Sequence, residues 1–481
     1  MRYSMQFVDY AIVVVFMLGV FTAGTWLGKS VKDVQGYYNA GKNLPWWAVM
    51  ISIVAAETSV LTFLSIPGLA YISDLSFLQV CLGYILGRFL VSFVLLPMYV
   101  RGNVISVYES IREKGGITMQ RVMSITFMFT RLLADGVRLF AVAIPLSMIS
   151  GLSYGASIWI MGIVTVAYTW FGGIRSVVWM DVVQWIIYIT AAFFTLGIAY
   201  NLLPEPGVIF STMAEAGKFK LFTFSLDMSN YSILSGLLGG AILSMASHGT
   251  DQLIVQRVLS CKNLADSKKA MIGSGFVVFF QFALFLFIGL LIYAVWNGAT
   301  LAEAGLTKSD EVFTLFIINQ LPPVIKGITV AGIFAAAMST LSGSLSALSS
   351  STTMDILKPL FKMEISKERL FRISRFVTLI WGIIMVGGAS LFKNMNNPLV
   401  EVGLSIASFT YGAMLGMFIL TRFFKKADVW QYVVTFFTTL FAMILVIQGT
   451  SIHWTWYTII GLIVSVITEQ VLVRLFGVKS A

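Results

Sequence analysis

Two apolar stretches of the sequence are interrupted by residues of types that bind ions or small polar solutes. In ISIVAAETSVLTFLSIPGLAY, Glu57 lies among threonines and serines and is followed by Pro67 and Gly68. In LLGGAILSMASHGTDQ, two glycines precede His248 and Asp251. Both stretches are predicted to be helices that unwind partway and expose backbone carbonyl and N–H groups to a ligand. The alternative is that their small residues allow close helix packing.

A third stretch, GIFAAAMSTLSGSLSALSSSTTMDIL, carries serines spaced by three, four and three residues, which places them on one face of a helix. They are Ser339, Ser342, Ser346 and Ser349. Their hydroxyl oxygens suit sodium, by analogy with other hard cations that prefer oxygen ligands. Small residues also line tight helix contacts, and composition favours neither interpretation.

Further ionisable residues lie inside apolar segments. Asp181, in GGIRSVVWMDVVQW, is predicted to bind a cation rather than to form a buried salt bridge, for which Arg175 is the nearest partner in sequence. Arg131, Asp135 and Arg138 are spaced by four and three residues, so they share one helix face.

The amino-acid composition indicates that these residues lie in a membrane environment. Of 481 residues, 58% are hydrophobic and only 11% are charged, and the mean hydropathy is +0.88. Soluble domains carry roughly 25% charged residues. The chain is therefore predicted to be an all-α polytopic membrane protein, which excludes a soluble enzyme, a nucleic-acid-binding protein and a membrane β-barrel. The sequence contains no P-loop signature for ATP-driven transport.

Cutting the apolar segments at charged or glycine-rich turns predicts about 13 transmembrane helices. Their ranges are 7–28, 46–71, 75–100, 120–150, 153–171, 175–203, 231–252, 268–296, 324–357, 370–393, 398–421, 428–448 and 453–474. Most Lys and Arg residues then fall in loops on the side of the C-terminus. Because positive loops stay in the cytoplasm, we expect a multi-pass plasma (inner) membrane protein with its N-terminus outside and its C-terminus in the cytoplasm.

The two interrupted stretches occupy corresponding places in two groups of five helices. Glu57 lies in the first helix of residues 46–203, and His248 lies in the first helix of residues 231–421. Since five is odd, the second group is expected to be inverted relative to the first, with the ligand site at the unwound segments. Residues 1–45 form an extra N-terminal helix and a cytoplasmic loop, residues 204–230 an external loop, and residues 422–481 two extra C-terminal helices.

Four motifs together resemble the sodium:solute symporter family, which includes bacterial sialic acid, sugar, proline and pantothenate transporters. They are YYNAGKNLPWW (37–47), GGIRSVVWMDVVQ (172–184), GTDQLIVQR (249–257) and FAAAMSTLSGSLSALSS (334–350). The resemblance covers nearly the whole chain and implies the inverted five-plus-five repeat of the leucine-transporter type.

The resemblance also implies where sodium binds. In the main site the ligands are the carbonyl groups of Ala55, Thr58 and Ala336 and the hydroxyl groups of Ser339 and Thr340. A second site, found in some members, is implied at Asp181, Ser339, Thr340 and Ser342, although Gly343 stands where one serine of that site would be.

For the solute, the resemblance to the sialic acid branch implies contacts from Ser59, Thr62 and, nearby, Gln79. The arginine that holds a carboxylate in that branch falls near Ala134. Two alternatives remain for the nearby charged residues. Either Arg131 reaches the solute from one helical turn away, or Arg131, Asp135 and Arg138 form a neutralising network around Glu57. The network is favoured. The remaining candidates are Glu57, Arg138 and His248, and Glu57 would accept hydroxyl hydrogen bonds from a neutral sugar or polyol.

The predicted function is sodium-coupled symport of a small polar organic solute, a sugar, polyol or sugar acid, by alternating access. The alternative is a proton-coupled or sodium-independent carrier of a monocarboxylate or another organic anion, with Asp181 or Glu57 carrying the proton. A membrane-embedded enzyme is disfavoured, because the chain has only two histidines and no metal-ligand cluster in its sequence. Sodium is the only metal expected. The expected partners are the solute, sodium and the lipid bilayer. We expect no organic cofactor, no nucleic acid and no obligate protein partner.

Overall fold

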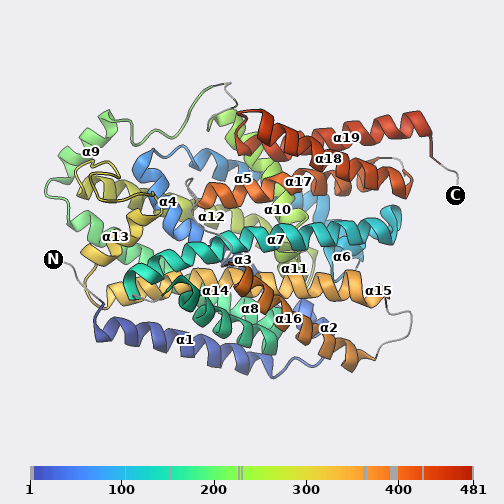
Figure 1. Cartoon of the computed structure of the whole chain (residues 1–481), viewed down its shortest axis with the longest axis horizontal. Helices are drawn as coiled ribbons and strands as arrows, with labels where there is room; N and C mark the ends of the chain where they lie inside the picture. Colours follow the sequence, from blue (N-terminus) through green and yellow to red (C-terminus); the bar gives the residue numbers. More distant parts are fainter. Residues whose placement is uncertain are drawn as a thin grey trace.

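The computed structural model describes residues 5–102, 104–150, 153–225, 228, 231–360, 366–389, 399–424 and 427–478. Within these residues the chain is helical and forms no strand (Figure 1). The helices that build the bundle are α1 (Phe7–Gly28), α3 (Trp46–Glu57), α4 (Val60–Ile72), α5 (Leu78–Leu90), α7 (Arg112–Ser150), α8 (Tyr154–Asn201), α10 (Gly240–Gly249), α11 (Gln252–Leu259), α12 (Leu264–Val295), α14 (Ile325–Ser351), α16 (Lys367–Ala389), α17 (Leu399–Phe423), α18 (Val429–Gly449) and α19 (Tyr457–Phe476). α6 (Leu96–Gly102) and α15 (Lys358–Leu360) continue the spans of α5 and α14. The helices in the connections are α2 (Val34–Asn39), α9 (Pro206–Glu215) and α13 (Glu311–Gln320).

Both predicted interruptions are confirmed. α3 ends at Glu57 and α4 begins at Val60, and the two helices are bent by 60°. Thr58 has non-helical φ and ψ angles of −77° and 79°, and the Ser59 hydroxyl caps α4 by accepting a hydrogen bond from the N–H of Leu61 at 3.2 Å. The chain therefore leaves backbone groups around residues 55–59 outside a regular helical ladder.

The second interruption lies between α10 and α11. α10 ends at Gly249, and the Asp251 carboxylate caps α11 by accepting a hydrogen bond from the N–H of Leu253 at 2.9 Å. An aspartate at this position satisfies an N–H that has no partner within the helix. The polar residues that interrupt the apolar pattern are thus the ones that end one helix and start the next.

The multi-pass helical architecture is confirmed, whereas the exact count of 13 membrane spans stays a prediction. Nine helices of the described chain are long and apolar enough to cross a membrane, or ten if α3 and α4 form one bent span. The predicted helices 153–171 and 175–203 correspond to the two parts of α8, which meet at a kink where Gly173 has a non-helical φ of 53°. At about 1.5 Å per residue, this 48-residue helix exceeds twice the hydrocarbon thickness of roughly 30 Å.

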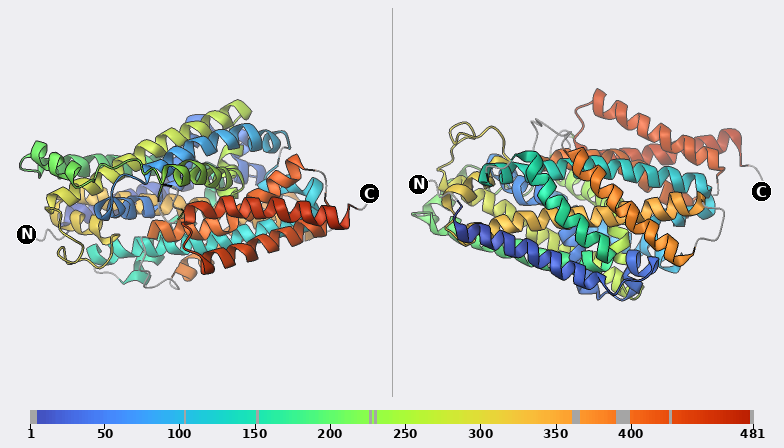
Figure 2. Two further views of the ribbon diagram at one scale, coloured as in Figure 1. Left: turned by 90° about the horizontal axis from the view of Figure 1, so that it is seen from above. Right: turned by 60° about the horizontal axis from the view of Figure 1, so that its bottom comes forward.

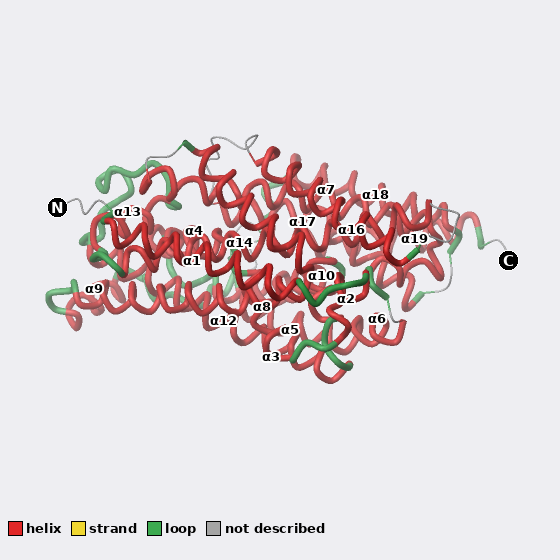
Figure 3. Tube along the Cα trace, turned by 90° about the horizontal axis from the view of Figure 1, so that it is seen from below, coloured by secondary structure: helices red, strands yellow, loops and turns green. Residues whose placement is uncertain are grey.

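Most of the loops that connect the helices lie toward the two ends of the bundle (Figure 3). At one end Leu44 pairs with Cys261 in an isolated β-bridge, which joins two loops predicted to be cytoplasmic. At the other end the N–H of Leu75 donates to the carbonyl of Lys220 at 3.1 Å, which ties the turn after α4 to the predicted external loop. α1 begins at one end and α19 finishes at the other (Figure 1).

α14, the serine-rich helix, is the most enclosed candidate span, with 94% of its most apolar window buried. α1 and the pair α18–α19 lie on opposite flanks of the bundle (Figure 2). α1 is joined to the start of α14 through Asp9, whose carboxylate accepts hydrogen bonds from the N–H groups of Val324 and Gly327 at 2.9 and 3.0 Å. The serines of α14 therefore face protein on all sides rather than lipid.

The contact between α4 and α12 depends on a glycine. A Cβ atom at Gly289 of α12 would lie 2.1 Å from the carbonyl oxygen of Pro67 in α4. We expect Gly289→Ala to lower stability by about 1–3 kcal/mol, because overpacking must push one backbone away from the other. Thermal unfolding in detergent measures this. Gly197→Ala in α8 is the matched control, since nothing lies within 4 Å of its added carbon; equal melting temperatures for the two variants would contradict the expectation.

Candidate functional site

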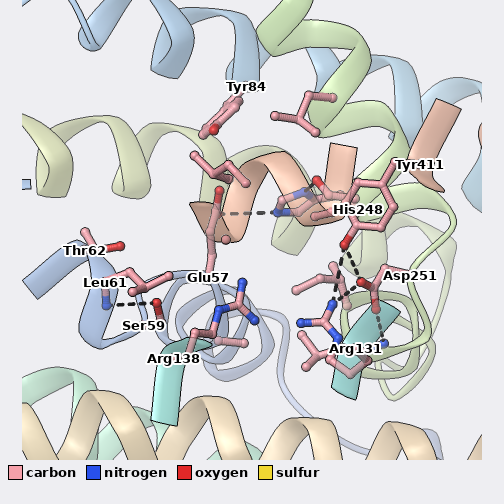
Figure 4. A pocket seen from close by; sticks show the side chains of 18 of the residues that line it. Glu57, Ser59, Leu61, Thr62, Tyr84, Arg131, Arg138, His248, Asp251 and Tyr411 are labelled. Carbon is pink, nitrogen blue, oxygen red and sulfur yellow. Dashed lines mark hydrogen bonds and ion pairs between the residues drawn. The ribbon is translucent and has the colours of Figure 1, made fainter. Parts of the chain in front are cut away.

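A pocket lies at the two helix interruptions (Figure 4). Glu57, Ser59 and Thr62 reach it from α3 and α4, and His248 and Asp251 reach it from α10 and the start of α11. α7 contributes Arg131 and Arg138, and α17 contributes Tyr411. The cavity volume is about 90 Å³. Six of the seven predicted solute-binding residues therefore line one pocket.

The seventh candidate, Gln79, is placed at the start of α5. Its side-chain amide donates to the carbonyl of Ser76 at 3.1 Å and accepts from the N–H of Thr223 at 3.2 Å. The Gln79 side chain thus forms hydrogen bonds at the start of its own helix and with the segment that precedes α10. It does not belong to the residues that line the pocket.

Glu57 is paired with an arginine from another helix. The Arg88 guanidinium of α5 forms an ion pair with Glu57, and it also donates to the hydroxyl of Ser274 at 2.7 Å. His248 Nε2 lies 3.4 Å from the same carboxylate. The Arg88 side chain is fully buried, whereas 16% of the Glu57 side chain is exposed to the pocket. Glu57 is therefore held by Arg88 from behind while part of its carboxylate faces the cavity.

Arg131 pairs with Asp251 and not with Glu57. Arg131 Nη2 contacts the Asp251 carboxylate, which also accepts a hydrogen bond from the Tyr411 hydroxyl at 2.6 Å (Figure 4). The Asp135 carboxylate lies 3.5 Å from Arg131 and 2.7 Å from Arg138. The predicted neutralising network exists, but it surrounds the second helix interruption at Asp251 instead of Glu57.

These pairings balance the charges around the pocket. The carboxylates of Glu57, Asp135 and Asp251 face the guanidinium groups of Arg88, Arg131 and Arg138. Arg138 is the most accessible of the three arginines, with 18% of its side chain exposed. An unpaired charge in such an enclosed site is costly, whereas paired charges that keep further hydrogen-bonding capacity are tolerated. The charged side chains of the pocket therefore add up to little net charge.

The predicted sodium ligands lie on α3, α8 and α14 and at the break after α3. Asp181 of α8 accepts hydrogen bonds from Ser52 of α3 and from Ser339 of α14, the latter at 2.6 Å. Ala55, Thr58 and Ala336 are fully buried. The Thr58 hydroxyl accepts a hydrogen bond from Gln281, and Thr58 stands at the break in the helix. The unwound segment after α3 therefore faces the serine-rich helix.

Thr340 lies beside the same interruption, because it lines a small cavity together with Ser59. The hydroxyls of Thr340 and Ser342 donate to carbonyl groups of their own helix, those of Ala336 and Ser339, at 3.2 and 3.1 Å. Asp181 also receives a hydrogen bond from Arg257 at 3.1 Å. The salt-bridge partner of Asp181 is thus Arg257 of α11, whereas Arg175 lies within 3.4 Å of Ser30.

The partners Arg88, Arg257, Tyr411 and Gln281 were missed in the sequence. Arg88 gave a usable signal, since a lone arginine inside the third apolar span requires a buried carboxylate partner. Arg257 gave a weaker signal, because it lies between the predicted helices 231–252 and 268–296, in a segment that also carries Lys262. Tyr411 and Gln281 are uncharged and ordinary for a transmembrane helix, so their roles follow only from the fold.

Comparisons with known proteins agree with this architecture. The chain is 26% identical to the sodium/sialic acid symporter NanT of Aliivibrio fischeri, over 97% of this chain and 93% of that protein. It is also 26% identical to the sodium/sialic acid symporter SiaT of Proteus mirabilis, over 98% and 96%. Among solved structures, a Na⁺-coupled sialic acid symporter in a substrate-bound outward-open state superimposes with a TM-score of 0.89 and 26% identity, covering 98% of both chains.

The sequence model of the sodium:solute symporter family matches residues 37–429, which include both helix interruptions and the serine-rich helix. Together with the multi-pass helical fold, this match identifies the chain as a membrane transporter that uses sodium as its coupling ion. The chain therefore belongs to the sodium:solute symporter family.

Proposed function

We propose that this protein couples the entry of sodium to the uptake of a small, neutral, hydroxyl-rich solute, a sugar or a polyol, by alternating access. The observation that carries the proposal is the charge balance of the pocket, where each carboxylate has an arginine partner. Partly exposed Glu57, with Ser59 and Thr62 beside it, offers acceptors and donors to solute hydroxyl groups. Proteins recognise neutral sugars with such hydrogen-bonding groups rather than with an unpaired charge.

A sugar acid is the second candidate, and two observations favour it. NanT and SiaT carry sialic acid in their names, and Arg138 is partly exposed to the pocket. A solute carboxylate would have to compete with Asp135 for Arg138, or with Asp251 for Arg131. Asp251 is itself held in place by a hydrogen bond from the Tyr411 hydroxyl. This competition makes the acid the less favoured substrate for this chain.

The proposed main sodium site consists of the carbonyl groups of Ala55, Thr58 and Ala336 and the hydroxyl groups of Ser339 and Thr340. Sodium at these oxygens would order the unwound segment after α3 against α14. Ser59 follows that segment and lines the solute pocket, so sodium and solute are expected to strengthen each other's binding, and the coupling is reciprocal. We place the protein in the plasma membrane with its N-terminus outside and its C-terminus in the cytoplasm, in accordance with the distribution of Lys and Arg.

The test is the thermal stability of the purified protein with sugars, polyols, sugar acids, amino acids and short carboxylates, each in sodium and in potassium. A ligand raises the melting temperature in proportion to the logarithm of its concentration over its Kd. We expect a neutral sugar or polyol to stabilise the protein in sodium only. Stabilisation by an acid alone would favour the second candidate. Stabilisation that is equal in potassium would contradict sodium coupling and favour a proton-coupled carrier.

A further inference from the structure

Arg257 lies in the transport core, although its sequence position suggested a loop. It is fully buried. Its guanidinium donates to the Ser52 hydroxyl of α3 at 2.8 Å, to the Asp181 carboxylate of α8 at 3.1 Å and to the carbonyl of Leu253 at 2.7 Å. A single positive group thus connects α11 to the two helices that hold Asp181 and Ser52.

The backbone of α14 is shaped around this group. A Cβ atom at Gly343 would lie 2.3 Å from Arg257 Nη2, 2.8 Å from Nη1 and 3.0 Å from Cζ. The guanidinium therefore occupies the space that any side chain at position 343 would fill. Gly343, which stands where the resemblance implies a serine, therefore leaves room for the guanidinium.

Both oxygens of the Asp181 carboxylate already accept hydrogen bonds from the protein in this arrangement. Its Oδ1 accepts from Ser339, and its Oδ2 accepts from both Ser52 and Arg257. A sodium ion next to this carboxylate would compete with the guanidinium for Oδ2. Two positive charges beside one fully buried carboxylate would also leave a net charge in a region from which water is excluded, which is unfavourable.

We propose that the Arg257 guanidinium acts as a tethered cation in the position that a second sodium ion would take beside Asp181, so that each transport cycle uses one sodium ion. This inference rests on the proposed function, because it counts the ions of that same sodium-coupled cycle. The tethered charge cannot leave the protein. It stabilises Asp181 in every state of the cycle without contributing to the driving force.

The first test is the number of sodium ions bound by the purified wild-type protein, measured with ²²Na⁺ by equilibrium dialysis against potassium. We expect one sodium ion per chain. Two ions per chain would overturn the inference and leave sodium coupling intact. If the protein binds no sodium at any concentration, the proposed sodium site itself is wrong. The number of bound ions therefore distinguishes a failure of this inference from a failure of the proposed function.

The second test compares Arg257→Gln with Arg257→Lys. The glutamine variant removes the tethered charge, so we expect Asp181 to bind a second sodium ion and the Hill coefficient for sodium to rise from about 1 toward 2. The lysine variant keeps the charge and is expected to bind one ion. A glutamine variant that folds and still binds one ion would contradict the proposal.

Since an unpaired buried Asp181 destabilises the fold, the double variant Asp181→Asn with Arg257→Gln removes both charges together. We expect it to bind one sodium ion, as the wild-type protein does, because the main site would keep its own oxygens. Loss of all sodium binding in a folded double variant would show that Asp181 holds the coupling ion, and the proposal would then be wrong.

Discussion

Replacing Ser339 and Thr340 together with alanine is expected to reduce sodium-stimulated uptake to the level measured in potassium. Both residues are buried on α14. Thr340 shares a small cavity with Ser59 next to the interruption between α3 and α4. Removing two of the five proposed oxygen ligands leaves sodium without enough partners to replace its hydration shell. Uptake into cells or proteoliposomes against sodium concentration measures the loss.

The matched control for this variant is Ser344→Ala. Ser344 is buried on the same helix, and its hydroxyl has no hydrogen-bond partner within the described chain. We expect sodium dependence close to that of the wild-type protein, because the substitution removes a hydroxyl that binds nothing. Normal sodium dependence in the Ser339→Ala, Thr340→Ala variant, with the protein present in the membrane, would refute the assignment of the main site.

Asp251→Ala is expected to destabilise the protein by about 3–5 kcal/mol, because it leaves the buried Arg131 guanidinium without its main counter-charge. The substitution also removes the cap of α11 and the hydrogen-bond acceptor of the Tyr411 hydroxyl. Thermal unfolding in detergent measures the effect. Glu368→Ala, at an exposed position in the first turn of α16, is the control and should change stability by less than about 0.5 kcal/mol.

A double variant tests whether the loss comes from the ion pair. Arg131→Ala combined with Asp251→Ala removes both charges, so it should be less destabilised than the sum of the two single variants. Asp135 would keep Arg138 as its partner in that background. Strict additivity would mean that Arg131 and Asp251 act independently, contrary to their contact in the structure.

The sequence predicted the features that depend on local patterns. Glu57 followed by Thr58 and Ser59 cannot continue an apolar helix at low cost, and the structure bends by 60° at that place. The serine spacing placed Ser339 and Ser342 on one face of a long helix, and α14 is that helix. These features follow from residues close together in the chain, so the periodicity of the sequence was enough to find them.

The partners of the charged residues did not follow from the sequence, because they are separated by long stretches of chain. Glu57 pairs with Arg88 across 31 positions, and Asp181 pairs with Arg257 across 76 positions. The sequence gives the number of buried charges but does not decide which of several opposite charges is nearest. Gly343 illustrates the same point, since its role depends on a guanidinium from another helix.

The hydrogen bonds of Asp9 to the start of α14 give the first helix an energetic role. Val324 has φ 73° and ψ −57°, a backbone conformation that costs a residue of its type on the order of 1–3 kcal/mol. The Asp9 carboxylate stabilises this turn by accepting its N–H together with that of Gly327. Withdrawing α1 would remove both bonds and leave a strained turn without support. A movement of α14 that breaks these two bonds would therefore cost free energy. In this way α1 takes part in setting the position of the helix that carries Ser339 and Thr340.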